Sequence, residues 1–425
     1  MLKRLKNIFR EKSKINTSED IERSKHFCML PWIHTHLLPN GDVLPCCVSD
    51  FNDPYANVND KSIKEAWNSD KYNATRKLML SDRPVYSCSK CYELEESGID
   101  TMRKQMNSWF KHHVNVLKDT KPDGSSTNLE MRYLDIRFSN ICNFKCRGCS
   151  PALSSSWYED HQKLWDFKSE DKKLINLTDA NPALWEEIED SLEHIEIAYF
   201  AGGEPLMMEE HYQCLELLIV KGKTDVELHY NTNMSVLKFK KYDLLHLWKQ
   251  FKKINLSISI DDIEARGEYF RSGLNWSKFV ENVNKVQSEL TNAVYEINCT
   301  LQIFNIHRIP QIHFYFYNKK IIDEYGFIFN TLQDPTEYRT QVLPKRFKES
   351  AEVKLKAYMG LLKQTHPDAD WSEFFGTLIS QINYMNSEDR THLLENFQIQ
   401  TERLDRIRSE SFKDTYPELL EMLDS

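Results

Sequence analysis

Residues 133–149, YLDIRFSNICNFKCRGC, decide the fold: a strand-like run from Tyr133 to Asn140 is followed by Cys142, Cys146 and Cys149. The cysteines have the spacing C-x3-C-x2-C. Three thiolates can hold three irons of a four-iron cluster and leave the fourth open to a ligand, which favours chemistry over electron storage. C-x2-C pairs also serve structural zinc, so the run by itself leaves both kinds of metal site open.

Strand-like runs alternate with helix-length segments from residue 130 to about residue 335. The runs are Tyr133–Phe138, Ile195–Phe200, Val226–Tyr230, Ile254–Ile260, Val294–Phe304 and Phe327–Asn330. Repeated βα units predict a parallel sheet or barrel whose site lies at the carboxyl ends of the strands. Because six strands are fewer than the eight of a closed barrel, we expect an α/β fold with an open or partial barrel.

The second strand-like run ends in a glycine turn, Ala201-Gly202-Gly203-Glu204-Pro205. Paired glycines let another backbone or a ligand approach closely, and the proline ends the strand. An ordinary strand-to-helix turn has the same composition, so the turn gains meaning only together with the three cysteines.

The three-cysteine run after the first strand and Gly-Gly-Glu-Pro after the second resemble the radical S-adenosylmethionine (SAM) superfamily. Its members share a partial (β/α)6 barrel, in which a reduced [4Fe–4S] cluster cleaves bound SAM to methionine and a 5′-deoxyadenosyl radical. The resemblance implies cluster ligands at Cys142, Cys146 and Cys149, and SAM contacts at Gly148, Gly202, Gly203, Glu204, Pro205, Asn233, Ser259 and Arg271. It assigns no catalytic side chain, because the radical initiator is the cofactor itself.

The resemblance implies that these residues contact different parts of SAM. Gly202, Gly203 and Glu204 are implied to receive the SAM amino group, and Ser259 with Arg271 to bind its carboxylate or ribose. The family has a bulky apolar or aromatic residue just before the third cysteine, where this chain has Gly148, so we expect a backbone contact to adenine and a weaker pocket wall there.

A second set of cysteines lies before the strands. Cys28 and Cys46 are separated by seventeen intervening residues, Gly41 precedes Cys46 by four intervening residues, and Cys88-Ser-Lys-Cys91 follows. Four thiolates can close an iron–sulfur cluster or a zinc tetrahedron. The surrounding sequence resembles the twitch or SPASM auxiliary-cluster modules of radical SAM enzymes, which generally follow the barrel, and implies one auxiliary [4Fe–4S] cluster. Cys47 is the alternative to Cys46, although the spacing from Gly41 favours Cys46.

Other polar residues near these motifs have weaker predictions. Trp32, His34 and His36 alternate as on one face of a strand, and we interpret the histidines as ordinary surface or core residues, with a substrate passage or ligand role as the alternative. Strand-end residues that could contact substrate are Asn330, Gln333 and Asp334. Cys214 and Cys299 lie in apolar runs and are expected in the core.

Composition narrows the class of protein. The 425 residues carry 64 acidic and 55 basic side chains, a net charge of -9, which argues against nonspecific nucleic-acid binding. No apolar stretch approaches the ~20 residues that span a bilayer, and the basic start Met1–Arg10 lacks a secretory apolar core, so we expect a cytoplasmic protein without a membrane partner. A helix that touches anionic lipid is the alternative for Met1–Arg10.

We expect four segments: an N-terminal segment (1–26), the auxiliary-cluster module (27–120), the barrel (129–340) and a helical C-terminal extension (341–425) of unreadable role. The expected function is a radical SAM enzyme that oxidises or modifies a peptide or small molecule, with a reducing donor such as flavodoxin or ferredoxin. The alternatives are a radical SAM enzyme that modifies RNA, and a noncatalytic zinc or iron–sulfur protein on the same fold.

Overall fold

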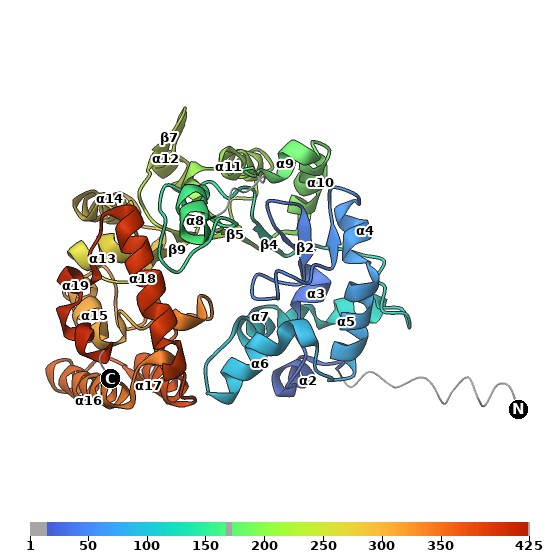
Figure 1. Cartoon of the computed structure of the whole chain (residues 1–425). Coiled ribbons are helices and arrows are strands. Elements are labelled where there is room, and N and C mark those ends of the chain that lie inside the picture. Colours follow the sequence, from blue (N-terminus) through green and yellow to red (C-terminus); the bar gives the residue numbers. More distant parts are fainter. Residues whose placement is uncertain (1–14, 167–171, 424–425) are drawn as a thin grey trace, which may run out of the picture. The chain divides into compact units, whose positions relative to one another are not determined.

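The computed structural model in Figure 1 describes residues 15–166 and 172–423. The chain divides into two compact units: unit 1 is Met1–Arg137 with Asn176–Ala198, and unit 2 is Phe138–Ile175 with Tyr199–Ser425. The expectation for Met1–Arg10 lies outside the described residues, and the four predicted segment boundaries stay predictions. Among the described residues, no helix is long and apolar enough to cross a membrane.

Unit 1 joins short strands to a set of small helices. Its strands are β1 (His36–Leu37), β2 (Asp42–Leu44), β3 (Ala56–Asn57), β4 (Tyr133–Ile136) and the first residues of β5 (Ile197–Phe200). Its helices are α2 (Ser18–Arg23), α3 (Leu30–Ile33), α4 (Ile63–Trp67), α5 (Asp70–Leu80), α6 (Ser89–Glu96), α7 (Met102–Phe110), α9 (Leu177–Ala180) and α10 (Leu184–Ser191), with 3-10 turns η1 (Tyr86–Cys88), η2 (Lys111–Asp119) and η4 (Leu192–His194). β4 pairs in parallel with both β1 and β5, and β2 pairs antiparallel with β1 and β3.

Local sequence explains several of these helix starts. Thr17 and Ser62 cap α2 and α4, and each forms a reciprocal capping box with the acidic residue three positions later. The core of unit 1 includes Trp67, whose ring carries the buried Arg76 guanidinium at 4.0 Å. Such a cation over an aromatic face stabilises an otherwise costly buried charge.

Unit 2 contains the parallel strands β6 (Glu227–Thr232), β9 (Ile254–Ser259), β10 (Ala293–Leu301) and β11 (Phe327–Thr331), paired in the order β6-β9-β10-β11. A small hairpin, β7 (Lys238–Phe239) with β8 (Tyr242–Asp243), stands apart. The helices that alternate with the strands are α8 (Tyr158–Trp165), α11 (Glu209–Val220), α12 (Leu244–Trp248), α13 (Glu264–Phe270), α14 (Trp276–Glu289) and α15 (Ile309–Asn318). All six predicted strands are present across the two units, and the prediction of a mixed α/β fold with a mostly parallel sheet is confirmed.

The C-terminal region is helical, as predicted, and belongs to unit 2. It consists of α16 (Lys345–Thr365), α17 (Ser372–Asn386), α18 (Leu394–Arg408) and α19 (Phe412–Thr415). α17 contacts β11, and α18 contacts α8. The region therefore packs against the βα elements rather than extending from them.

The strand expected at Trp32–His36 is wrong. Leu30–Ile33 is a short helix with Pro31 in its first turn, a position that helices tolerate because that N–H has no intrahelical acceptor. Only His36 and Leu37 are strand. Cys214 on α11 and Cys299 on β10 are fully buried, so the prediction that both are core residues is confirmed.

Candidate cofactor sites

The three-cysteine loop of unit 2 is held by backbone hydrogen bonds from the end of α13. Within the loop, Lys145 N donates to Ser272 O at 2.9 Å and Arg147 N to Phe270 O at 2.8 Å. Burial raises the pKa of the Cys142, Cys146 and Cys149 thiols, to about 12 for Cys149. Buried thiols of this kind deprotonate readily only when a metal takes the thiolates, which is the donor set that a [4Fe–4S] cluster requires.

The glycine turn lies directly on this loop. Glu204 N donates to Ile141 O at 2.7 Å, and a Cβ on Gly203 would lie 2.1 Å from the same oxygen. Gly202 has φ +119°, a conformation that L side chains rarely adopt. Both glycines are therefore required for the close approach of the turn to the residue before Cys142.

Glu204 is a buried carboxylate held at a fixed position. It accepts hydrogen bonds from Leu206 N at 3.1 Å, Thr232 Oγ1 at 2.6 Å and Asn233 N at 2.8 Å. Burial outweighs these bonds and raises its pKa from 4.5 to about 7. Pro205 follows as the first residue of a buried 3-10 turn, η5 (Pro205–Met207). A carboxylate with remaining acceptor capacity in a buried site is suited to a cationic ligand.

Two further predicted SAM contacts also lie beside the cysteine loop. The Asn233 side chain donates to Asn143 Oδ1 at 3.0 Å. The Arg271 guanidinium pairs with Asp261 at 2.9 Å, and its Nη1 lies 3.9 Å from Cys146 Sγ. Ser259 is the half-buried last residue of β9, and no contact of its side chain with the loop is recorded among the described residues.

Gly148 faces two apolar side chains. A Cβ at this position would lie 3.2 Å from Leu332 Cδ1 and 3.5 Å from Phe270 Cζ. Leu332 and Phe270 thus occupy the space beside Gly148, where the resemblance leads us to expect a bulky residue.

Arg147, inside the cysteine run, was not singled out by the sequence analysis. Its buried guanidinium pairs with Asp405 and, at 2.6 Å, with Glu410, and lies 3.8 Å from the centre of the Tyr269 ring. The loop is therefore tied to the C-terminal region. A charged residue between predicted metal ligands indicates that an oppositely charged residue lies nearby in the fold. The sequence does not identify which acidic residue pairs with Arg147.

In unit 1, four predicted ligands line one cavity: Cys28, Cys46, Cys88 and Cys91. Burial is the largest cause that raises the pKa of all four thiols, to about 12 for Cys88, and negative charge on the neighbouring thiols adds to it for three of them. Thiols that interact in this way lie close together. The donor set fits an enclosed metal cluster with four protein ligands.

Cys47 does not line this cavity. Its thiol faces Asp135, whose negative charge adds to burial in raising the pKa of Cys47 to about 12. The structure therefore brings Cys46, and not its neighbour, together with the other three cysteines.

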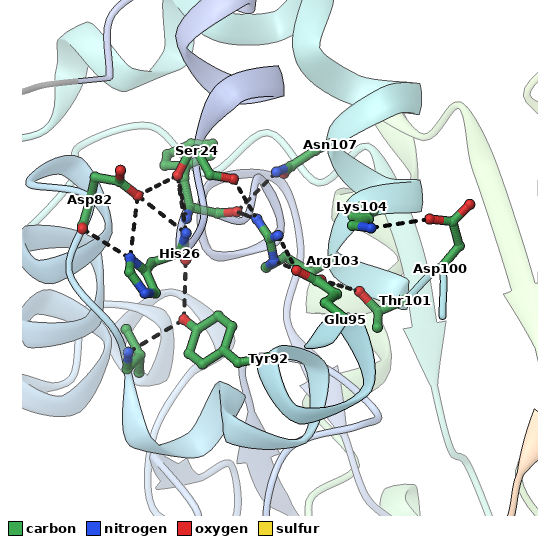
Figure 2. Close-up of polar contacts among 12 residues, drawn as sticks. Ser24, His26, Asp82, Tyr92, Glu95, Asp100, Thr101, Arg103, Lys104 and Asn107 are labelled. Atoms are coloured by element: carbon green, nitrogen blue, oxygen red, sulfur yellow. Dashed lines mark hydrogen bonds and ion pairs between the residues drawn. The ribbon is translucent and has the colours of Figure 1, made fainter. Parts of the chain in front are cut away.

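Polar contacts fix the peptide groups on both sides of Cys28. Figure 2 shows Glu95, Arg103 and Asn107, which take part in these contacts. Arg103 donates to Phe27 O at 2.9 Å and pairs with Glu95, with both side chains nearly buried. Asn107 donates to Phe27 O and accepts from Met29 N, both at 2.9 Å. Since Arg103 also lines the cavity, it brings a positive charge to the auxiliary site.

His34 and His36 are buried in unit 1, which agrees with their interpretation as core residues. His34 Nδ1 bonds to Tyr133 O at 2.9 Å, and burial lowers the pKa of His34 to about 4. His36 Nδ1 lies 3.2 Å from the Asp135 carboxylate, which Arg137 approaches to 3.0 Å. Burial acts to raise the pKa of Asp135, but the Arg137 guanidinium and the hydrogen bond with His36 outweigh it and hold this pKa well below its usual range.

The remaining predicted substrate contacts lie at the end of β11 or just after it in unit 2. Asn330 Nδ2 donates to Asn298 Oδ1, and Gln333 Nε2 donates to the Tyr384 hydroxyl at 3.2 Å. Asp334 follows Gln333 in the same loop. Contact of these residues with a substrate stays a prediction.

Comparisons with known proteins bear on both sites. Residues 28–92 match the SPASM family, described as an iron–sulfur cluster-binding domain. GTP 3′,8-cyclase of Campylobacter lari is 29% identical over 126 residues, which is 30% of this chain and 34% of that protein. Two crystal structures of Streptococcus suis SuiB are similar. The one bound to S-adenosylmethionine has 15% identity and a TM-score of 0.38 over 71% of this chain and 64% of SuiB. The other has 12% identity and a TM-score of 0.36 over 72% of this chain and 63% of SuiB.

The matched region spans about a third of the length of the curated relative. The SPASM match covers the stretch from Cys28 through Cys91, the four cysteines of the unit 1 cavity. The SPASM match bears out the prediction of an iron–sulfur cofactor in this module. Residues 28–92 are thus similar to a SPASM-type iron–sulfur module, and the predicted resemblance to radical SAM proteins is confirmed.

Proposed function

We propose that this protein is a radical SAM enzyme that reductively cleaves SAM at a [4Fe–4S] cluster to form a 5′-deoxyadenosyl radical. The radical oxidises or modifies a peptide or small-molecule substrate, with help from the auxiliary cluster. The observation that carries this proposal is the junction in unit 2, where Glu204 N bonds to Ile141 O and Arg271 lies 3.9 Å from Cys146 Sγ. A three-thiol loop, an anionic anchor and a cation thus belong to one site.

Each group in this site has a separate task in binding. Cys142, Cys146 and Cys149 hold three irons of the cluster, which supplies the electron for SAM cleavage when bound. The Glu204 carboxylate holds the SAM ammonium group, since its three donors fix its position and leave acceptor capacity. Arg271 holds the SAM carboxylate, and the backbone of Gly148 contacts adenine. The strands form a partial (β/α)6 barrel around the substrate.

The auxiliary cluster is held by Cys28, Cys46, Cys88 and Cys91. Four protein ligands leave no iron open to substrate, which favours electron transfer over substrate binding. One electron must enter from a low-potential donor of the flavodoxin or ferredoxin class. GTP 3′,8-cyclase is named for a nucleotide substrate, so GTP belongs beside peptides in a substrate screen.

The test is anaerobic purification with iron and sulfide, followed by iron analysis and measurement of 5′-deoxyadenosine released from SAM under reduction. We expect about eight irons per chain and SAM cleavage. Cys146→Ala should lose cleavage and about four irons, whereas the matched control Cys214→Ala, a buried cysteine on α11, should retain both. Stoichiometric zinc without cleavage would instead indicate a metal-stabilised binding protein.

A further inference from the structure

The C-terminal helix α18 packs against the three-cysteine loop. Its Leu404 forms a buried apolar cluster with Trp157 and Leu164, and Cys149 and Ile407 pack against this cluster. α18 runs beside α8, which follows the loop in sequence (Figure 1). One predicted iron ligand thus packs against an apolar cluster to which the tail contributes Leu404.

Ion pairs cross this contact in both directions. Arg147 of the loop pairs with Asp405 and Glu410 of the tail. Arg408, the last residue of α18, donates from Nε to Asp160 of α8 at 2.8 Å. These reciprocal pairs fix the position of the Arg408 side chain relative to the loop.

The two terminal nitrogens of the Arg408 guanidinium have no hydrogen-bond partner in the described part of the chain. Its side chain is 1% exposed, and neither Nη1 nor Nη2 has a hydrogen-bond partner among residues 15–166 and 172–423. The centre of the Trp157 ring lies 4.6 Å from the guanidinium carbon. Buried charged donors without acceptors are rare in folded proteins, so they indicate a ligand that supplies acceptors.

The surroundings identify the chemistry of that ligand. Trp157, beneath the guanidinium, donates from Nε1 to Cys146 O at 2.7 Å. The Arg408 charge acts on both Cys146 and Cys149, since it opposes the burial that raises the pKa of these thiols. Arg271 reaches Cys146 as well and pairs with Asp261. Arg408 pairs with Asp160 through Nε, and its two Nη groups are left without a hydrogen-bond acceptor in the described part of the chain.

A sulfur-rich anion meets this requirement. A [4Fe–4S] core of charge +2 with three thiolates has a net charge of −1, which becomes −2 after reduction by one electron. Its sulfur atoms accept hydrogen bonds, and such bonds together with nearby charge set the reduction potential. A cation favours the more negative, reduced form.

We propose that Arg408 donates its Nη hydrogens to sulfur of the cluster held by Cys142, Cys146 and Cys149, and so raises the reduction potential of that cluster. This inference rests on the proposed function. It gives the C-terminal region a role: the tail supplies a positioning residue for the SAM-binding cluster. The electron for reduction comes from the external donor, and Arg408 changes only how readily the cluster accepts it.

The experiment is a redox titration of the full-length protein followed by electron paramagnetic resonance. All variants carry Cys46→Ala, so that the SAM-binding cluster is observed without the auxiliary one. Arg408→Gln should make reduction at least tenfold less favourable, a fall in midpoint potential of about 59 mV or more for one electron. Arg406→Gln removes the same charge from an exposed position on α18 and should leave the potential unchanged.

Arg408→Lys keeps the charge but has a different donor geometry, so its potential should lie between those of the parent and Arg408→Gln. An Arg408→Gln potential equal to that of Arg406→Gln would overturn the inference, whatever happens to stability. If Arg408→Gln does not retain iron, Arg408→Lys is the deciding variant. A midpoint potential about 28 mV below that of the parent, which is a threefold less favourable reduction, supports the proposal, and a potential equal to that of the parent refutes it. If the parent protein shows no cluster signal, the proposed function fails instead.

Discussion

Substitution of Gly203 by alanine tests whether the glycine turn and the cysteine loop form one site. The added Cβ would lie 2.1 Å from Ile141 O, 2.8 Å from Ile141 C and 3.0 Å from Asn140 C. All three are backbone atoms, so relief requires a shift of about 1 Å in the segment that leads to Cys142. A shift of that size also breaks the 2.7 Å hydrogen bond from Glu204 N.

The expected cost combines two effects. Overpacking of a well-packed site costs about 1–3 kcal/mol, and loss of one buried hydrogen bond adds about 1 kcal/mol. We therefore expect Gly203→Ala to reduce the free energy of unfolding by about 2–4 kcal/mol and to lower the iron content from about eight to about four.

The assay is urea unfolding of the cluster-free protein, followed by tryptophan fluorescence, with iron analysis after reconstitution. The matched control is Gly360→Ala on α16, where an added Cβ meets nothing within 4 Å. That change should stabilise the helix by about 0.5–1 kcal/mol and leave the iron content unchanged. Equal unfolding midpoints and equal iron for the two variants would refute the packing of the turn on the loop.

Three further outcomes are expected. Cys46→Ala should lower iron from about eight to about four per chain, whereas Cys47→Ala should retain all of it, because only Cys46 lines the cavity; equal iron in both variants would contradict this assignment. Because burial raises the pKa of Glu204 to about 7, its carboxylate is mostly protonated at pH 6 and ionised at pH 8. Equilibrium binding should show up to about tenfold weaker SAM affinity at pH 6, and Glu204→Gln should abolish this pH dependence. Arg103→Ala leaves a nearly buried carboxylate unpaired and should cost about 3–5 kcal/mol in urea unfolding, whereas Lys104→Ala, which loses an exposed pair, should cost less than about 1 kcal/mol.

The strands and the two sets of cysteines could be predicted because their signals are local. A buried strand appears in the sequence as a short run with apolar residues. The run Ile254–Ile260 also contains several β-branched isoleucines, which favour a strand. Metal ligands belong to a few residue types at short, fixed spacings, so they can be recognised in the sequence without tertiary information. The segment Trp32–His36 shows the limit of this reasoning, since alternation over so few residues did not reveal the short helix at Leu30–Ile33.

The sequence by itself determined the class of the protein: a βα series, a three-thiol loop, a glycine turn and a separate four-thiol module, because each is encoded within a short stretch. The spacing from Gly41 favoured Cys46 over Cys47, and the tertiary structure decided between them, since only Cys46 lines the cavity. It also brought Arg408 to Asp160, 248 residues away in the chain. Electrostatic pairing acts through space, so no local pattern in the tail indicates which loop its charges hold.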